Sequence, residues 1–185
     1  AACRMALNQD GSIQLQMGAT EIGQGADTVF TQMAAASTGI SEEKVHILSM
    51  QDTDVTPFDS GAYASRQSYV SGMAVKKTGE ALRAKILNYA AWLLDCPVRE
   101  LHLHDDAIWD DTGAQRMTME QLAMEACYSR RRTEHIAAEE TVHCTQNTFS
   151  TGCCFAEVEV DIPLGKVRVL RLLNVHDSGT ILNPK

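Results

Sequence analysis

The sequence has few aromatic residues, 5% of 185, and only four prolines. It lacks any apolar run near the ~20 residues that a membrane-spanning helix needs, and it does not open with a charged and then apolar secretion signal. Its six cysteines show no C-x-x-C spacing, which disfavours a zinc ribbon or a redox pair. We therefore expect a globular protein of the reducing cytoplasm that does not bind membranes.

Positive charge is also scarce, because 16 Lys and Arg stand against 24 Asp and Glu, a formal net charge of -8. Such a surface repels phosphates at long range, so we expect no nucleic-acid partner. The apolar content of 44% is enough to build a sizeable core. The first residue is not Met and the last residues follow a turn-forming Asn183-Pro184, so we expect a piece of a longer polypeptide.

Hydrophobic periodicity predicts strands and helices in irregular order. This order favours an α+β fold, with a mixed β-sheet and two or three packed helices, over a doubly wound parallel sheet. Gly72 and Gly79 inside the longest helical pattern predict close packing against a neighbouring backbone. No internal domain boundary is expected within residues 1–185. The predicted helices are 26–38, 67–94 and 118–127, and the predicted strands are 3–7, 12–18, 45–50, 101–103, 107–109, 152–162 and 167–175.

Two glycine-containing turns, each followed by a helical pattern, are the most informative feature of the chain. The first is Ile22-Gly23-Gln24-Gly25, and the second runs from Gly61 to Arg66 after an acidic loop. Free backbone N–H groups and the positive end of a helix would face outward at each turn, which suits an anionic cofactor. The Gln24 amide adds donors and an acceptor for a polar metal or pterin edge. We expect the turns near Gln24 and Ala64 to meet in space around a pterin-held metal.

Other motifs fit less well. The glycines from Gly18 to Gly25 do not match the G-x-G-x-x-G dinucleotide fingerprint. The acidic loop fails as a calcium-binding EF-hand, because Pro57 stands at the required glycine position and Tyr63 at the glutamate position. His102 and His104 share one face of a predicted strand, and a zinc hydrolase that uses them is the weakest of the alternatives.

Three segments in order, IGQGADTVFTQ, QDTDVTPFDSGAYASRQSYVSG and LNVHDSGTILNP, resemble the molybdenum-binding subunit of the xanthine dehydrogenase and aldehyde oxidase family, most closely its bacterial xanthine dehydrogenase branch. The resemblance implies that the chain is part of a larger molybdopterin-binding domain. It further implies that Gln24 contacts the molybdopterin, that the Ala64 backbone lies near molybdenum, and that Ser68 lies near the pterin or its phosphate. The implied cofactor-binding residues are Gly23, Gln24, Gly25, Ala64, Ser65, Arg66, Gln67 and Ser68.

The same resemblance implies an enzyme that hydroxylates an electron-poor ring carbon of xanthine or a related purine with oxygen from water. Its electrons would pass to 2Fe-2S and FAD groups on partner domains or subunits. No residue of this chain is assigned as catalytic, because the family's Gly-Glu-Pro-Pro glutamate is absent and Glu21 matches a structural position. We expect the isolated chain to be catalytically silent and, through exposed apolar surface, capable of self-association. The alternative function is a non-catalytic module that binds a phosphate-bearing ligand or assembles subunits.

Overall fold

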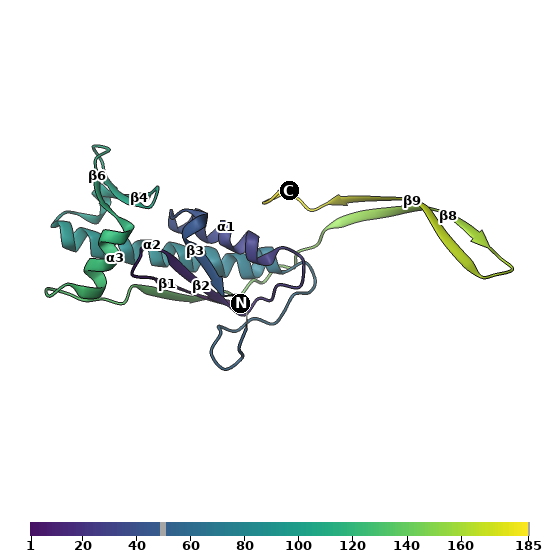
Figure 1. The fold of residues 1–185 in the computed structure, drawn as a ribbon, viewed down its shortest axis with the longest axis horizontal. Helices are drawn as coiled ribbons and strands as arrows, with labels where there is room; N and C mark the ends of the chain where they lie inside the picture. Colours follow the sequence, from purple (N-terminus) through teal and green to yellow (C-terminus); the bar gives the residue numbers. More distant parts are fainter. Residues whose placement is uncertain (49–50, 185) are drawn as a thin grey trace. The chain divides into compact units, whose positions relative to one another are not determined.

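A computed structural model describes residues 1–48 and 51–184 of the chain. The chain forms two compact units, Ala1–Gln146 and Asn147–Lys185. No helix in the described ranges has both the length and the apolarity needed to cross a bilayer. The elements in chain order (Figure 1) are β1 (Ala2–Leu7), β2 (Ile13–Met17), α1 (Ala26–Thr38), η1 (Glu42–Lys44), β3 (Val45–Leu48), η2 (Gln67–Ser71), α2 (Gly72–Leu94), η3 (Val98–Glu100), β4 (Leu101–His104), β5 (Ala107–Asp110), β6 (Gln115–Thr118), α3 (Met119–Tyr128), β7 (Ala137–Thr141), β8 (Thr151–Asp161) and β9 (Lys166–Asp177).

The main sheet of the first unit has the strand order β3-β2-β1-β7. β1 pairs antiparallel with β2 and with β7, whereas β2 pairs parallel with β3. A parallel pair needs a crossover connection, and α1 supplies it between β2 and β3. The predicted α+β class with a mixed sheet is therefore confirmed.

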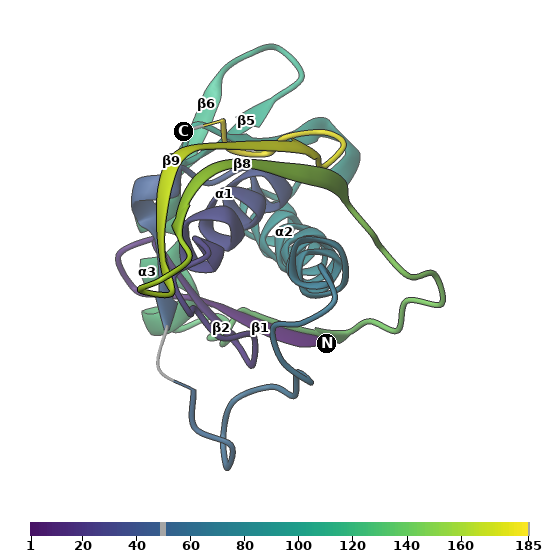
Figure 2. The same cartoon turned by 90° about the vertical axis from the view of Figure 1, so that its right-hand side faces the viewer.

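Helices α1 and α2 pack against each other and cover one face of this sheet (Figure 2). A Cβ atom added at Gly79 would lie 1.9 Å from Ser37 Oγ, and one added at Gly72 would lie 2.7 Å from Met33 Sδ. The close packing predicted from these two glycines is confirmed, but the nearest atoms are side chains of α1 and not the expected backbone. The 26–38 helix has the predicted bounds, because left-handed Gly25 and Gly39 flank it at φ 82° and 83°.

Two short strands were not expected from the sequence. β6 extends the predicted pair of β4 and β5 into a three-stranded sheet, and β7 joins the edge of β1. Both are four or five residues long and mostly polar, so neither carries a clear alternating pattern. The predicted strand 45–50 is seen as β3 up to Leu48, and its last two positions, Ser49 and Met50, lie outside the described residues.

The second unit is an antiparallel hairpin of β8 and β9 with a register from Thr151↔Asp177 to Asp161↔Lys166. Both strands are exposed along their whole length. A two-stranded hairpin has no hydrophobic core of its own. The expectation that residues 1–185 contain no internal domain boundary therefore stays a prediction.

Candidate functional site

The first predicted turn links β2 to α1 and contains two glycines in the left-handed region. Gly23 has φ 100° and Gly25 has φ 82°, conformations that disfavour any residue with a Cβ atom. A Cβ atom added at either glycine would meet no atom of residues 1–48 or 51–184 within 4 Å, so the described structure leaves the space outside the turn open. Gln24 lies between them with an exposed side chain.

The backbone N–H groups of Ile22, Gly23 and Gly25 in this turn are not free, which corrects the expectation from sequence. The Glu21 carboxylate accepts hydrogen bonds from the N–H groups of Gly23, Gly25 and Asp27 at 2.6, 3.1 and 3.1 Å. The hydrogen bond from Asp27, assisted by those from the two glycines, lowers the pKa of Glu21. An internal carboxylate therefore takes the place at the helix end that an external anion would occupy.

The Gln24 side chain is fixed by backbone groups on both sides of its amide. Gln24 Nε2 donates to the Thr20 carbonyl at 3.0 Å, and Gln24 Oε1 accepts from the Ile22 N–H at 2.7 Å. A carbonyl only accepts and an N–H only donates, so these partners settle which end of the amide is oxygen.

In the second predicted turn, two residues other than glycine have a left-handed backbone conformation. Ala64 has φ 50° and Ser65 has φ 55°, and both are exposed. Such conformations cost free energy and are concentrated at functional sites. In the part of the chain that the structure describes, the Ala64 N–H has no hydrogen-bond partner, so this amide can donate to a ligand.

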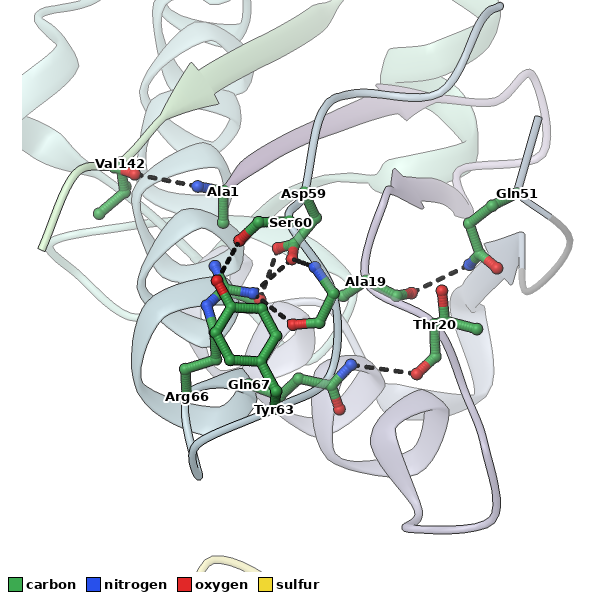
Figure 3. A network of polar contacts seen from close by, with 12 residues as sticks. Ala1, Ala19, Thr20, Gln51, Asp59, Ser60, Tyr63, Arg66, Gln67 and Val142 are labelled. Atoms are coloured by element: carbon green, nitrogen blue, oxygen red, sulfur yellow. Dashed lines mark hydrogen bonds and ion pairs between the residues drawn. The ribbon is translucent and has the colours of Figure 1, made fainter. Parts of the chain in front are cut away.

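A buried carboxylate holds the second turn in shape (Figure 3). Asp59 Oδ1 accepts from the Gly61 N–H at 2.9 Å and from Arg66 Nη1 at 2.5 Å, and Asp59 Oδ2 accepts from Ser71 Oγ at 2.7 Å. The Asp59 side chain is 0% exposed and that of Arg66 is 12% exposed. Burial raises the pKa of Asp59, but the hydrogen bonds from Gly61, Arg66 and Ser71 outweigh it and the pKa is lowered.

The two turns meet through side chains from different elements. Gln24 Nε2 donates a hydrogen bond to Gln67 Oε1. Gln67 Nε2 donates to the Thr20 carbonyl at 3.0 Å (Figure 3). Gln51 Nε2 at the start of the acidic loop also donates to the Ala19 carbonyl at 2.9 Å. The expectation that the turns meet in space is therefore confirmed, and Gln67 is the residue that joins them.

The remaining predicted residues, Arg66 and Ser68, adjoin Gln67 in the sequence but have different surroundings. The Arg66 guanidinium is turned inward to Asp59 and to the Gly61 carbonyl, which it contacts at 2.7 Å, so its role in the structure is to hold the loop. Ser68 is exposed and borders a groove of about 580 Å³ between α1 and α2. Sequence reasoning missed Asp59 as the residue that holds the second turn, although an Asp two residues before a glycine is a signal for such a role.

His102 and His104 do not share a third ligand. His102 Nε2 lies 2.7 Å from Asp111 Oδ1, while the His104 ring stacks on Trp109 with a 5.0 Å separation of the ring centres. Within residues 1–48 and 51–184, no three or more His, Cys, Asp or Glu side chains form a group able to hold a metal ion.

Comparison with known proteins finds a matching family and similar sequences along the whole chain. The family described as molybdopterin cofactor-binding domain matches residues 1–185. The chain is 47% identical over 186 aligned residues to the xanthine dehydrogenase molybdenum-binding subunit of Escherichia coli O157:H7, covering 100% of this chain and 25% of that protein. It is 28% identical to the carbon monoxide dehydrogenase large chain of Hydrogenophaga pseudoflava, covering 99% of this chain and 23% of that protein.

A solved structure shares the fold. The crystal structure of the Cu,Mo carbon monoxide dehydrogenase in its carbon monoxide reduced state superposes with a TM-score of 0.78 at 24% identity, over 99% of this chain and 23% of that one. The chain spans about a quarter of the length of these relatives. Two joined turns on an α+β frame and a family match over every residue lead to one conclusion: the chain belongs to the molybdopterin cofactor-binding domain family.

Proposed function

We propose that this chain is the molybdopterin-binding portion of a molybdenum hydroxylase that oxidises purines such as xanthine. The observation that carries the proposal is the direct contact of Gln24 with Gln67, which makes one site of two turns distant in sequence. The 47% identity to a xanthine dehydrogenase subunit supports the choice of purine over other heterocycles. The six free cysteines are consistent with a cytoplasmic enzyme.

The residues on the site fit a pterin cofactor with a phosphate. The Ala64 N–H, which has no partner among the residues that the structure describes, is a donor for an anionic edge. The open space outside Gly23 and Gly25 lets a flat ring approach the backbone. Gln24 is the neutral polar group between the two glycines. The residues that would hold the cofactor are Gly23, Gln24, Gly25, Ala64, Ser65, Gln67 and Ser68, with Arg66 supporting the second turn.

When bound, the cofactor supplies the redox chemistry of the reaction. This chain's residues bind and orient it, and none of them moves a proton in the proposed scheme. The catalytic base, the 2Fe-2S and FAD groups and most substrate contacts would come from the rest of a longer subunit and from its partners. The 185 residues alone are accordingly expected to be catalytically silent.

The test uses the complete polypeptide that contains these residues. Molybdenum and pterin content per polypeptide, together with xanthine-dependent electron transfer, are measured for wild type, Gln24→Ala and the control Gln115→Ala. Gln115 is an exposed residue of β6 far in sequence from both turns. We expect Gln24→Ala to lose activity and Gln115→Ala to keep it. The absence of molybdenum or pterin from the wild-type protein would refute the proposal.

A further inference from the structure

The backbone N–H groups of the first turn bind a carboxylate from the same chain, that of Glu21. Both oxygens of the Glu21 carboxylate are used: Oε1 accepts from the N–H groups of Gly23 and Gly25, and Oε2 accepts from the N–H of Asp27. These donors are the ones that a phosphate bound at the start of α1 would need. An incoming anion would meet occupied donors and a like charge.

The same carboxylate also determines where Gln24 lies. Glu21 binds the N–H groups of the residues directly before and after Gln24, so the backbone that carries this side chain is held from both sides. The side-chain amide is then oriented by Thr20 and Ile22. A small shift of this backbone would move the amide away from its contact with Gln67.

The second turn differs from the first in its backbone N–H donors, which are the groups that an anion would contact. Its carboxylate, Asp59, accepts from the Gly61 N–H and two side chains, and it leaves the Ala64 N–H without a partner among the described residues. Ala64 is exposed, whereas the Gly23, Gly25 and Asp27 N–H groups at the first turn are bound by Glu21. The two turns are therefore unequal as anion sites.

We propose that Glu21 is a positioning residue for the cofactor: its carboxylate occupies the anion place of the first turn, holds the backbone on both sides of Gln24, and leaves the anionic part of the cofactor to the turn at Ala64 and Ser65. This inference rests on the proposed function. It assigns no proton transfer to Glu21, which touches the cofactor only through the residues it holds.

The experiment compares Glu21→Ala and Glu21→Gln with the control Glu43→Ala in the complete polypeptide. Glu43 is an exposed carboxylate of η1. Amide hydrogen exchange is followed at Gly23, Gly25 and Asp27, and molybdenum content is measured alongside. Glu21→Ala should speed exchange at these amides about tenfold or more, since hydrogen bonds to a charged group are lost, and should lower molybdenum content. Glu21→Gln, with one acceptor oxygen, should lie between wild type and Glu21→Ala.

Formate then tests whether the missing element is an anion. Added formate should restore slow exchange and molybdenum content in Glu21→Ala and should have no effect on Glu43→Ala. Inorganic phosphate added to wild type should slow exchange at the Ala64 turn and leave the amides of the first turn unchanged. The proposal is overturned if Glu21→Ala or Glu21→Gln exchanges like wild type, if formate does not restore Glu21→Ala, or if phosphate protects the first turn. If Glu21→Ala fails to fold, Glu21→Gln decides.

Failure of this inference can be told apart from failure of the proposed function. Exchange at the first turn and its response to formate need no molybdenum, so they report on Glu21 alone. Absence of molybdenum and pterin from the wild-type protein would refute the proposed function whatever the exchange data show. Wild-type loading together with an unchanged Glu21→Ala would refute only the role of Glu21.

Discussion

Gln24 and Gln67, 43 residues apart in the sequence, are joined by a hydrogen bond from Gln24 Nε2 to Gln67 Oε1. Both side chains also donate to the carbonyl of Thr20. Three groups from two separate turns thus form one closed set of polar contacts, and neither turn can shift without the other. Such mutual support is how a binding site is held in shape before its ligand arrives.

Replacing Gln67 with Ala should therefore separate the turns. It removes one acceptor and one donor, and we expect a loss of about 1 kcal/mol in the free energy of unfolding together with a marked fall in molybdenum content. Chemical denaturation of the chain and metal analysis of the complete polypeptide measure the two effects. Gln115→Ala on β6 is the control, and equal molybdenum content in both variants would contradict this account.

Asp59→Ala should be the more destabilising change. The Asp59 side chain is fully buried and Arg66 is nearly so, and removal of one partner leaves an uncompensated charge that costs about 3 kcal/mol. Lys76→Ala is the comparison, because the pair of Lys76 with Glu80 is more than half exposed and is expected to contribute less than about 0.5 kcal/mol. Denaturation midpoints that fall equally in both variants would show that Asp59 does not hold the loop.

Stability should fall in acid partly through the same carboxylate. The pKa of Asp59 in the folded chain lies below its ordinary value of 3.8, so the unfolded chain binds the proton more readily and the stabilisation is present above about that pH. As the pH falls through the lowered pKa, this contribution is lost. The free energy of unfolding measured against pH should decline more steeply below pH ~4 in wild type than in Asp59→Asn. Parallel curves would argue against this assignment.

Gly79→Ala should disrupt the contact of α1 with α2. The added Cβ would lie 1.9 Å from Ser37 Oγ and 2.8 Å from Ser37 Cβ, and we expect a cost of about 1–3 kcal/mol despite the better helix propensity of alanine. Gly72→Ala should cost less, because its nearest neighbour is the flexible end of Met33. Thermal unfolding checks both variants. Ser37→Gly should recover part of the loss at Gly79, and strict additivity of the two changes would exclude the clash.

The sequence was sufficient for elements with strong local signals. The helix 26–38 was predicted with its bounds because glycines stand at both ends. The strands 3–7 and 12–18 were predicted because Asp10-Gly11 separates two alternating runs, and they pair as β1 and β2. β7 was missed because its formation depends on the free edge of β1, a partner 135 residues away in the pair of Arg4 with Glu139. Tertiary pairing of this kind leaves no periodic signal in a five-residue strand.

The site was predictable in its location and less so in its chemistry. The glycines announced both turns, and their meeting through Gln24 and Gln67 agrees with the expectation. The donors of the first turn were expected to be free, but Glu21 binds them. A Glu two residues before a glycine can point outward or back to the backbone, and only the fold decides between the two.

The pairing of β1 with β7 affects how the chain is made. The outer edge of β1 finds its partner only after residue 141 has left the ribosome. At a synthesis rate of about 5–20 residues per second, that delay is roughly 7 to 28 seconds. For this period the nascent chain exposes a row of unpaired strand N–H and C=O groups able to pair with other chains. A chaperone that shields strand edges during translation should therefore raise the yield of correctly folded protein.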